Sequence, residues 1–339
     1  MKTQILDSKN ENDILIGAEI IKNGGLVAFP TETVYGLGAN ALNEDAVKKV
    51  YKAKGRPSDN PMIVHIARAS DIGQLTPMLS PVIVNLIDNF WPGPLTLVVK
   101  KKDAVPKTTT GGLDTVAVRM PDSQGALDLI NRAGVPIAAP SANISGRPSP
   151  TKAEHVIHDM DGKIDAILKG EDCRVGIEST VLDVTGAVPT ILRPGIITAE
   201  QIEAALGKKV EMDSTLTKRP SKEQLAGSEE FKPKSPGMKY KHYAPKAQMV
   251  VVEGQRENVK KEIARLKNLN EKLGNKVGII LFEEQAFIEA AHDFFADLRE
   301  MDKQEMDMIL AGALADADGV GFAVMNRMLK SAGYNIVKV

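Results

Sequence analysis

A short basic segment at 52–61 holds residue types suited to binding a polyphosphate. Its sequence is Lys-Ala-Lys-Gly-Arg-Pro-Ser-Asp-Asn-Pro, so Lys54 and Arg56 stand at alternate positions. Alternate side chains point to the same side of an extended backbone, and Gly55 would let that backbone approach a ligand closely. The alternative interpretation is a helix that ends in basic residues and continues as a solvated turn. These residues alone leave both interpretations open.

Four more segments place polar or glycine-bearing residues beside apolar runs that read as strands. They are 30–38 (PTETVYGLG), 115–119 (TVAVR), 140–146 (PSANISG) and 193–195 (RPG). Ligands of α/β proteins tend to bind at strand ends, and one such segment is usually only a turn. Several of them together, with hydroxyls, amides and arginines, predict a pocket for a polar anionic ligand.

Individual residues in this set also have purely structural interpretations. His65 lies in an apolar run, where a core histidine with one hydrogen bond is the commoner outcome. Arg119 suits either an ion pair or a ligand carboxylate, because its guanidinium is a planar fork of donors. Ser141 and Asn143 suit an Asx or ST turn. Cys173 is the only cysteine, and with no activating neighbour we expect a small semi-buried residue.

Alternating helix and strand patterns supply the elements that would position these residues. Apolar spacing predicts helices over 12–23, 44–53, 80–90, 123–133 and 199–206. Short apolar runs predict strands over 26–29, 62–66, 95–99, 115–119, 136–139, 164–168, 179–184 and 190–193. Because several strands are consecutive, we expect an α/β fold with a twisted mixed sheet and helices on its faces. Neither standard glycine-rich phosphate loop occurs in the sequence.

Composition divides the chain into a domain at 1–210, a linker at 211–245 and a smaller α/β domain at 246–339. The linker is rich in Lys, Pro, Ser and Glu and ends in SPGMKYKHYAP. A plain tether would not need the aromatic and basic residues at 239–243, so an arm that folds over a site as a lid competes with a simple tether. Rossmann-like alternation follows, without an obvious catalytic constellation. Its expected strands are 249–252 and 277–281, and its expected helices are 256–273, 284–295, 303–315 and 322–332.

The overall composition excludes several classes of protein. The chain has 339 residues, 43% of them apolar and 26% charged, with a formal net charge of −1. No global field therefore draws it to nucleic acid. The N-terminus lacks the pattern of a signal peptide, and no apolar run is long enough to span a membrane. With a single cysteine, these features predict a cytoplasmic protein that makes no membrane contact.

Taken in order, these segments resemble the YrdC-like family of threonylcarbamoyl-AMP synthases. The matching pieces are PTETVYGLG at 30–38, KGRP at 54–57 with Asn60-Pro61, PGPLT at 92–96, VAVRMP at 116–121, APSANISG at 139–146, STV at 179–181 and RPG at 193–195. The linker end at 235–245 and GVGFAVMNRML at 319–329 resemble the two-domain form. The resemblance implies a YrdC-like twisted mixed sheet with flanking helices, followed by a smaller Rossmann-like domain.

The resemblance also implies a reaction and its participants. L-threonine, bicarbonate and ATP would give threonylcarbamoyl-AMP and pyrophosphate, which makes the enzyme a nucleotidyltransferase. A downstream threonylcarbamoyltransferase complex would pass the group to an adenosine of tRNA, and we include a weak direct tRNA contact among the expectations. Magnesium would accompany the phosphates of ATP, and no protein residue is assigned as a metal ligand.

Residue roles follow from the resemblance, position by position. It implies that threonine is held by Thr33, His65, Arg119, Ala139 and Ser179, with Arg119 on the carboxylate. It implies that ATP is contacted by Arg56, Asn60, Thr115, Ser141, Ser149, Arg193 and Tyr243. The expected catalytic residues near the phosphates are Lys54, Arg56, Ser141 and Asn143. Tyr243 would reach back from the linker, which makes the linker a lid, and no general base is identified.

Two functions of other classes compete with this one. An RNA-binding module would use the same cationic loop, but the near-neutral first domain and the lack of aromatic stacking platforms argue against it. A carbamoyl- or acyl-phosphate hydrolase or transferase would use the same anion pocket. Pyrophosphate release that needs both threonine and bicarbonate would separate the three.

Overall fold

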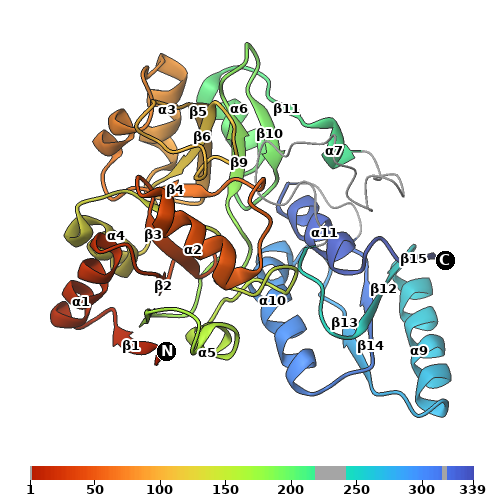
Figure 1. Cartoon of the computed structure of the whole chain (residues 1–339). Helices are drawn as coiled ribbons and strands as arrows, with labels where there is room; N and C mark the ends of the chain where they lie inside the picture. The colour runs from red at the N-terminus through yellow and green to blue at the C-terminus, as the bar shows by residue number, and fades with distance from the viewer. Residues whose placement is uncertain (1, 218–241, 315–318) are drawn as a thin grey trace.

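Two sheets organise the chain, each with its own helices, as Figure 1 shows. The structure is a computed structural model that describes residues 2–217, 242–314 and 319–339. The larger sheet and its helices, red to green in Figure 1, lie beside the smaller unit in cyan and blue. Most of the linker, 218–241, lies outside the described residues, so the lid expectation can be followed only at the two ends of the linker.

The larger sheet mixes parallel and antiparallel neighbours in the order β1-β8-β2-β3-β7-β4-β6-β5-β9-β10-β11. Its strands are β1 Gln4–Asp7, β2 Val27–Phe29, β3 Gly36–Asn40, β4 Ile63–His65, β5 Leu95–Lys100, β6 Thr115–Arg119, β7 Ile137–Ala139, β8 Ala166–Lys169, β9 Thr180–Asp183, β10 Thr190–Arg193 and β11 Glu211–Met212. The helices around it are α1 Glu11–Lys22, α2 Glu44–Lys54, a short 3₁₀ helix Ala69–Gln74, α3 Pro81–Phe90, α4 Gln124–Ala133, α5 Ala153–Met160, α6 Ala199–Leu206 and α7 Ser214–Thr217. The expected twisted mixed sheet with flanking helices is confirmed.

The smaller sheet is parallel throughout, in the order β13-β14-β12-β15. Its elements are β12 Gln248–Glu253, α9 Arg256–Lys272, β13 Val277–Ile280, α10 Phe287–Lys303, β14 Met308–Gly312, α11 Gly319–Ser331 and β15 Ile336–Lys338. In Figure 1, α10 and α11 lie on the side of this sheet that faces the larger unit, and α9 lies on the far side. The Rossmann-like alternation is therefore confirmed.

One predicted element is wrong. The helix expected at 303–315 is absent over the described residues 304–314, because 308–312 is strand β14, paired on both sides with β12 and β13. A parallel strand with neighbours on both sides is buried on both faces, so it shows a continuous apolar run instead of the alternation that marks a half-exposed strand. The helix before it is correspondingly longer than expected and runs to Lys303.

The apolar contacts of the smaller unit extend into the larger one. Val34 and Ile177 of the larger unit are buried in the same apolar cluster as Phe294 and Phe295 of α10. Gly176 adopts a φ of +81°, and a Cβ built there would lie 2.3 Å from the carbonyl oxygen of His292. Only glycine permits both that backbone conformation and that approach. The loop before β9 is thus packed directly on the backbone of α10.

Candidate active site

A cavity opens where β2, β4, β6, β7 and β10 meet their following loops. It holds about 570 Å³ of empty space, counting the part open to solvent. Its walls come from every one of the polar segments singled out in the sequence. The lining residues are Thr31, Thr33, Val34, Tyr35, Gly36, Arg56, Ile63, His65, Arg119, Ala139, Pro140, Ser141, Glu178, Arg193, His242 and Tyr243.

The basic segment 52–61 contains both a helix end and a cavity wall. Helix α2 starts at an Asn43 cap and ends at Gly55, which has a left-handed φ of 62°. Lys52 is exposed on the last turn, as the helix-end interpretation predicted. Arg56 turns into the cavity and donates from Nη2 to the carbonyl of Pro61 at 3.0 Å. Burial lowers the pKa of Arg56 to about 10, so the guanidinium remains charged at neutral pH.

Lys54 is hydrogen-bonded to the loop that contains Ser141 and Asn143. Its side chain is buried, and its ammonium donates to the carbonyl oxygens of Ser141 and Asn143. The amide of Ser145 in turn donates to the carbonyl of Lys54 at 2.9 Å. Burial lowers the pKa of Lys54 well below its ordinary value, and the neighbouring Arg56 adds to the effect. In this structure Lys54 therefore ties the 141–145 loop to the end of α2 and does not line the cavity.

Ser141 and Asn143 bond to each other and within their own loop through their side chains, in place of the Asx or ST turn expected of these residue types. The Ser141 hydroxyl donates to Asn143 Oδ1 at 2.5 Å, and Asn143 Nδ2 donates to the carbonyls of Ile144 and Arg147. Ser141 lines the cavity, whereas the Asn143 amide is used inside the loop. The loop thereby presents the Ser141 hydroxyl to the cavity and uses the Asn143 amide as an internal brace.

A second group of cavity residues gathers around Arg119 at the end of β6. Arg119 Nη1 donates to Thr33 Oγ1 at 2.9 Å, and Nε donates to the carbonyl of Gly93 at 3.2 Å. Glu32 faces the third nitrogen of the guanidinium. His65 lies beside this cluster at the end of β4, with burial and the charge of Arg119 lowering its pKa to about 3. The imidazole is therefore neutral at physiological pH.

Arg193 and Glu178 form the third wall. Arg193 donates from Nε to the carbonyl of Ser179 and from Nη2 to its hydroxyl, each at 3.0 Å. Burial of Glu178 alone would raise its pKa, but Arg327 and Arg193 outweigh that and hold the pKa below its usual value. The carboxylate is therefore charged, and it accepts from Ser149 Oγ at 2.5 Å and from Arg327 Nε at 3.1 Å.

Tyr243 brings the linker end to the cavity. It is 6% exposed, has a left-handed φ of 65° and packs against Phe295 with ring centroids 5.1 Å apart and ring planes tilted by 39°. Burial raises its pKa to about 12, so the phenol is neutral. The next residue, Ala244, donates its amide to the carbonyl of Gly146 at 2.8 Å. Both the ring and the backbone of this segment are thus fixed against neighbouring elements.

The structure brings most of the expected site residues to one place, but not all of them. Eight line the cavity: Thr33, Arg56, His65, Arg119, Ala139, Ser141, Arg193 and Tyr243. Six do not: Lys54, Asn60, Thr115, Asn143, Ser149 and Ser179. Ser149 and Ser179 bond to lining residues, and Asn60 accepts from Tyr51 and Arg56 through its carbonyl. Thr115 begins β6, whose other end carries Arg119, about 13 Å away along the strand.

Several polar and charged residues in or beside the cavity were not among the expected site residues, and His242, next to Tyr243, is one of them. Thr31 and Glu32 stand inside the 30–38 segment that the sequence had marked, and Glu178 directly precedes the STV segment. Arg327 is a charged residue inside the apolar 319–329 run, which was a usable signal for a buried ion pair. Its acidic partner could not be identified, because the pair is 149 residues apart.

The cavity is equipped to bind an extended anion. Three guanidiniums, from Arg56, Arg119 and Arg193, reach it from three separate segments. Guanidinium forks suit carboxylates and phosphates, and they stabilise charge that develops there. Among the described residues no group of three or more His, Cys, Asp or Glu side chains could hold a metal ion. In the same part of the chain, no helix is long and apolar enough to cross a membrane.

Comparison with known proteins covers nearly the whole chain. Residues 19–195 match the Sua5/YciO/YrdC family model, described as "Telomere recombination", and 197–333 match the C-terminal domain model of threonylcarbamoyl-AMP synthase. A threonylcarbamoyl-AMP synthase of Pyrococcus abyssi is 47% identical, covering 96% of each chain. One of Bacillus subtilis is 45% identical, covering 98% of this chain and 96% of the relative. The crystal structure of P. abyssi Sua5 complexed with L-threonine superposes over 100% of both chains, with a TM-score of 0.92 at 45% identity.

Proposed function

The chain belongs to the Sua5/YciO/YrdC family in its two-domain form, and from that premise we propose that its arginine-lined cavity is where L-threonine, bicarbonate and ATP react. The chain is a threonylcarbamoyl-AMP synthase, an enzyme of the nucleotidyltransferase type that serves the threonylcarbamoyl-adenosine modification of tRNA. The observation that carries the assignment to this cavity is the convergence of Arg56, Arg119 and Arg193 on it. We take 1–210 as the catalytic domain, 211–245 as the linker and 246–339 as the C-terminal domain.

The chemistry needs two new bonds. The amine of threonine joins the carbon of bicarbonate with loss of water, which gives a carbamate. A carbamate oxygen then attacks the α-phosphorus of ATP, the bond from that phosphorus to the bridging oxygen breaks, and pyrophosphate leaves with the electron pair. Negative charge grows on the phosphoryl oxygens during the second step, so fixed cations beside them lower its barrier.

The threonine end of the cavity is the Arg119 cluster. Arg119 binds the carboxylate of threonine, and Thr33, His65, Ala139 and Ser179 complete that subsite. His65 is neutral, so it offers threonine a hydrogen-bonding group without adding a second positive charge beside Arg119. Thr33, His65 and Ala139 line the cavity together with Arg119, which supports this subsite.

The ATP end is formed by Arg56, Ser141, Arg193 and Tyr243, which line the cavity. We assign Arg56 and Ser141 to the phosphates, where Arg56 supplies charge and Ser141 supplies a hydroxyl. Lys54 and Asn143 stay in the proposal as catalytic residues, and their contacts support a role through the 141–145 loop. The remaining proposed ATP contacts are Asn60, Thr115 and Ser149.

Magnesium enters the proposal with ATP. The described residues do not offer a cluster of metal ligands, and the cavity carboxylate Glu178 is engaged by Arg327 and Ser149. This fits an ion held mainly by phosphate oxygens, which is how Mg²⁺ is usually bound in nucleotide sites. When bound, it would neutralise the phosphates and help pyrophosphate to leave.

Partners and location extend the proposal further. The mixed anhydride product is reactive, so a transferase complex that consumes it is required, and we include a weak contact with the tRNA substrate. The single cysteine supports a cytoplasmic location.

Pyrophosphate release tests the function. The purified chain should release pyrophosphate from ATP only when threonine and bicarbonate are both present. Release that continues without threonine would favour a hydrolase and overturn the proposal. RNA binding with steep salt dependence and no pyrophosphate release would favour the RNA-binding module instead.

A further inference from the structure

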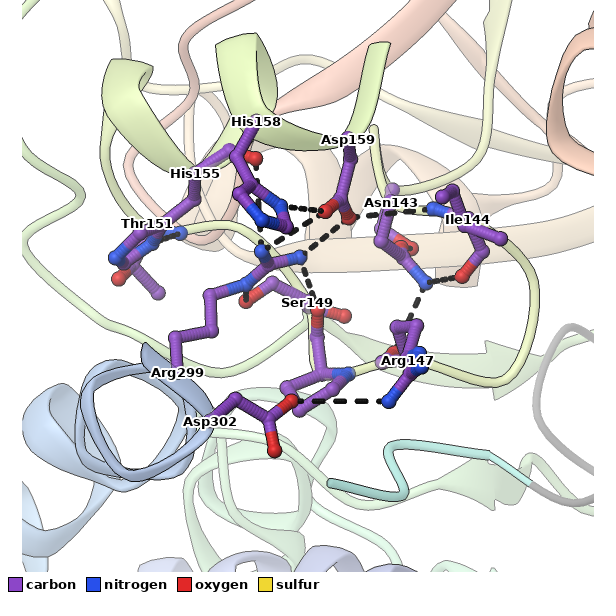
Figure 2. A network of polar contacts seen from close by, with 12 residues as sticks. Asn143, Ile144, Arg147, Ser149, Thr151, His155, His158, Asp159, Arg299 and Asp302 are labelled. Atoms are coloured by element: carbon purple, nitrogen blue, oxygen red, sulfur yellow. Dashed lines mark hydrogen bonds and ion pairs between the residues drawn. The ribbon is translucent and has the colours of Figure 1, made fainter. Parts of the chain in front are cut away.

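An arginine of the C-terminal domain is hydrogen-bonded to a loop of the catalytic domain that contains proposed ATP-binding residues. Arg299 of α10 donates to the carbonyl of Pro148 at 2.6 Å and to that of Ser149 at 3.4 Å, and it reaches Asp159 of α5 at 2.8 Å (Figure 2). The Arg299 side chain is 9% exposed and that of Asp159 is 5% exposed. Five donors in a fixed fork allow one guanidinium to hold a carboxylate and two carbonyls at once.

Asp159 also contacts the loop that contains Ser141. Its Oδ2 also accepts from the amide of Ile144 at 3.3 Å, next to the Asn143 brace. Burial would raise the pKa of Asp159, but the hydrogen bond and charge of Arg299 outweigh that and keep the pKa below its usual value. A weaker contact, Arg147 to Asp302 at 3.8 Å, joins the same loop to α10 (Figure 2).

A second arginine of the C-terminal domain is linked to the same serine through Glu178. Arg327 of α11 is fully buried and donates to Glu178 Oε2 at 3.1 Å and to the carbonyl of Pro194 at 2.5 Å. Glu178 accepts from the Ser149 hydroxyl through its other oxygen. Ser149 is therefore held at its carbonyl by Arg299 and at its hydroxyl by the Glu178–Arg327 pair.

We propose that the C-terminal domain sets the geometry of the ATP side of the catalytic cavity, with Arg299 and Arg327 acting as positioning residues for the 141–149 loop, Glu178 and the Arg193–Pro194 segment. This inference rests on the proposed function, because it takes the 141–149 wall as the ATP side. Neither arginine lines the cavity: Arg327 acts through Glu178, which does, and Arg299 acts through Ser149, which bonds to Glu178.

Ser179, at the edge of the threonine side, follows Glu178 directly and accepts from Arg193, but the centre of that side is bonded differently. Its central cluster of Arg119, Thr33 and Glu32 is bonded within the catalytic domain, through the carbonyl of Gly93 and through β6. Removing Arg299 or Arg327 should therefore raise KM for ATP more than KM for threonine. A general loss of folded protein would instead lower the maximal rate without raising KM for ATP selectively, which makes the two effects separable.

The test compares substrate constants in matched arginine variants. Arg299→Met should raise KM for ATP by about tenfold or more while leaving KM for threonine within about twofold, since small misplacements of binding groups are costly. Arg299→Lys keeps the charge near Asp159 but cannot reach both carbonyls, so its ATP constant should lie between those of Arg299→Met and the wild type. Arg265→Met removes an exposed arginine of α9 that pairs with Glu262 within its own helix, and it should behave as wild type.

A second pair of variants covers the Arg327 branch. Arg327→Met alone would leave a buried carboxylate unpaired and is expected to unfold, so it is combined with Glu178→Gln. This double variant should again raise KM for ATP selectively, by more than Glu178→Gln alone. Calorimetric titration with ATP and with threonine, run below each melting temperature, gives the same comparison without turnover.

The outcomes separate the inference from the function on which it rests. A wild type that releases no pyrophosphate would overturn the proposed function. An active wild type whose folded Arg299→Met and double variants keep both substrate constants unchanged would overturn the positioning role alone, even if their melting temperatures fall. Equal losses for ATP and threonine would also overturn it, because they would indicate structural weakening only. If Arg299→Met does not fold, an Arg299→Lys variant with an unchanged ATP constant is enough to reject the role.

Discussion

Arg119 and Glu32 form a buried ion pair within the proposed threonine subsite, with Arg119 Nη2 and Glu32 Oε2 2.6 Å apart. The two side chains are 4% and 2% exposed, so water screens the pair very little. The contact is close but not aligned as a hydrogen bond, and within the described residues that nitrogen and both Glu32 oxygens have no directed partner. The guanidinium therefore keeps a donor for an incoming carboxylate while its charge is balanced.

Glu32→Gln should lower stability and make threonine a stronger stabiliser. Loss of the carboxylate leaves Arg119 buried without a counter-charge, at a cost of about 3–5 kcal/mol in the free energy of unfolding. A bound threonine would then supply the missing carboxylate, and ligand binding stabilises the folded state by mass action. Thermal unfolding with and without saturating threonine measures this. Equal melting-temperature increments in the variant and the wild type would contradict the assignment of Arg119 to the threonine carboxylate.

Arg56→Ala should abolish most catalysis while the fold survives. Its guanidinium is the cation that the basic segment turns into the cavity, and removing one preorganised electrostatic group typically lowers kcat by about 10²–10³-fold. Lys52→Ala is the matched control, since Lys52 is exposed on the last turn of the same helix and should be dispensable. Steady-state pyrophosphate release measures both variants. Normal turnover in Arg56→Ala would leave the segment as a helix end and a turn only.

The predictable part of this fold is the part with local signals. Asn43 and Gly55 bound α2, and both are visible in the sequence as cap residues. The strand β14 was mistaken for a helix because its apolar run carries no period that distinguishes the two, and only its neighbours in the sheet decide. Features that depend on local sequence patterns could therefore be predicted, whereas features that depend on tertiary contacts could not.

The candidate site follows the same division. Lys54 and Arg56 carry the same charge two positions apart, yet one is buried against the carbonyls of Ser141 and Asn143 and the other faces the cavity. That difference depends on a loop almost ninety residues further along the chain, with which Lys54 packs. The chain of contacts from Arg299 to Ser149 is still more distant in sequence, so no spacing rule could have found it.

Stability should fall as the pH is lowered below 6.5, partly through His65. Burial and Arg119 lower the pKa of His65 to about 3 in the folded chain, from the ordinary value of 6.5. Above pH 6.5 the ring is neutral in both states and makes no difference. Below pH 6.5 His65 binds a proton in the unfolded chain but stays neutral in the folded chain, which stabilises the unfolded state. The free energy of unfolding therefore falls by about 2 kcal/mol between pH 6.5 and 5 through His65.

Urea unfolding of the ligand-free chain at several pH values measures this share. His65→Asn should reduce the slope of unfolding free energy against pH below 6.5 by about 1.4 kcal/mol per pH unit. Burial and Arg299 also lower the pKa of His155 to about 3, so some slope should remain in the variant. A slope identical to that of the wild type would mean that His65 takes up its proton in the folded chain.

Tyr243→Ala should weaken ATP binding or let the reactive product escape. The ring fills the cavity wall against Phe295, and its backbone is held in a left-handed conformation that tyrosine rarely adopts. Removing the ring opens the cavity to water, so we expect KM for ATP to rise by about tenfold or threonylcarbamoyl-AMP to hydrolyse faster.

Tyr334→Ala is a matched control, because Tyr334 also has a left-handed φ, of 60°, and lies outside the cavity lining. Tyr243→Phe separates the ring from its hydroxyl. If Tyr243→Ala keeps the wild-type ATP constant and product yield, the end of the linker contributes nothing to catalysis, and the lid proposal fails.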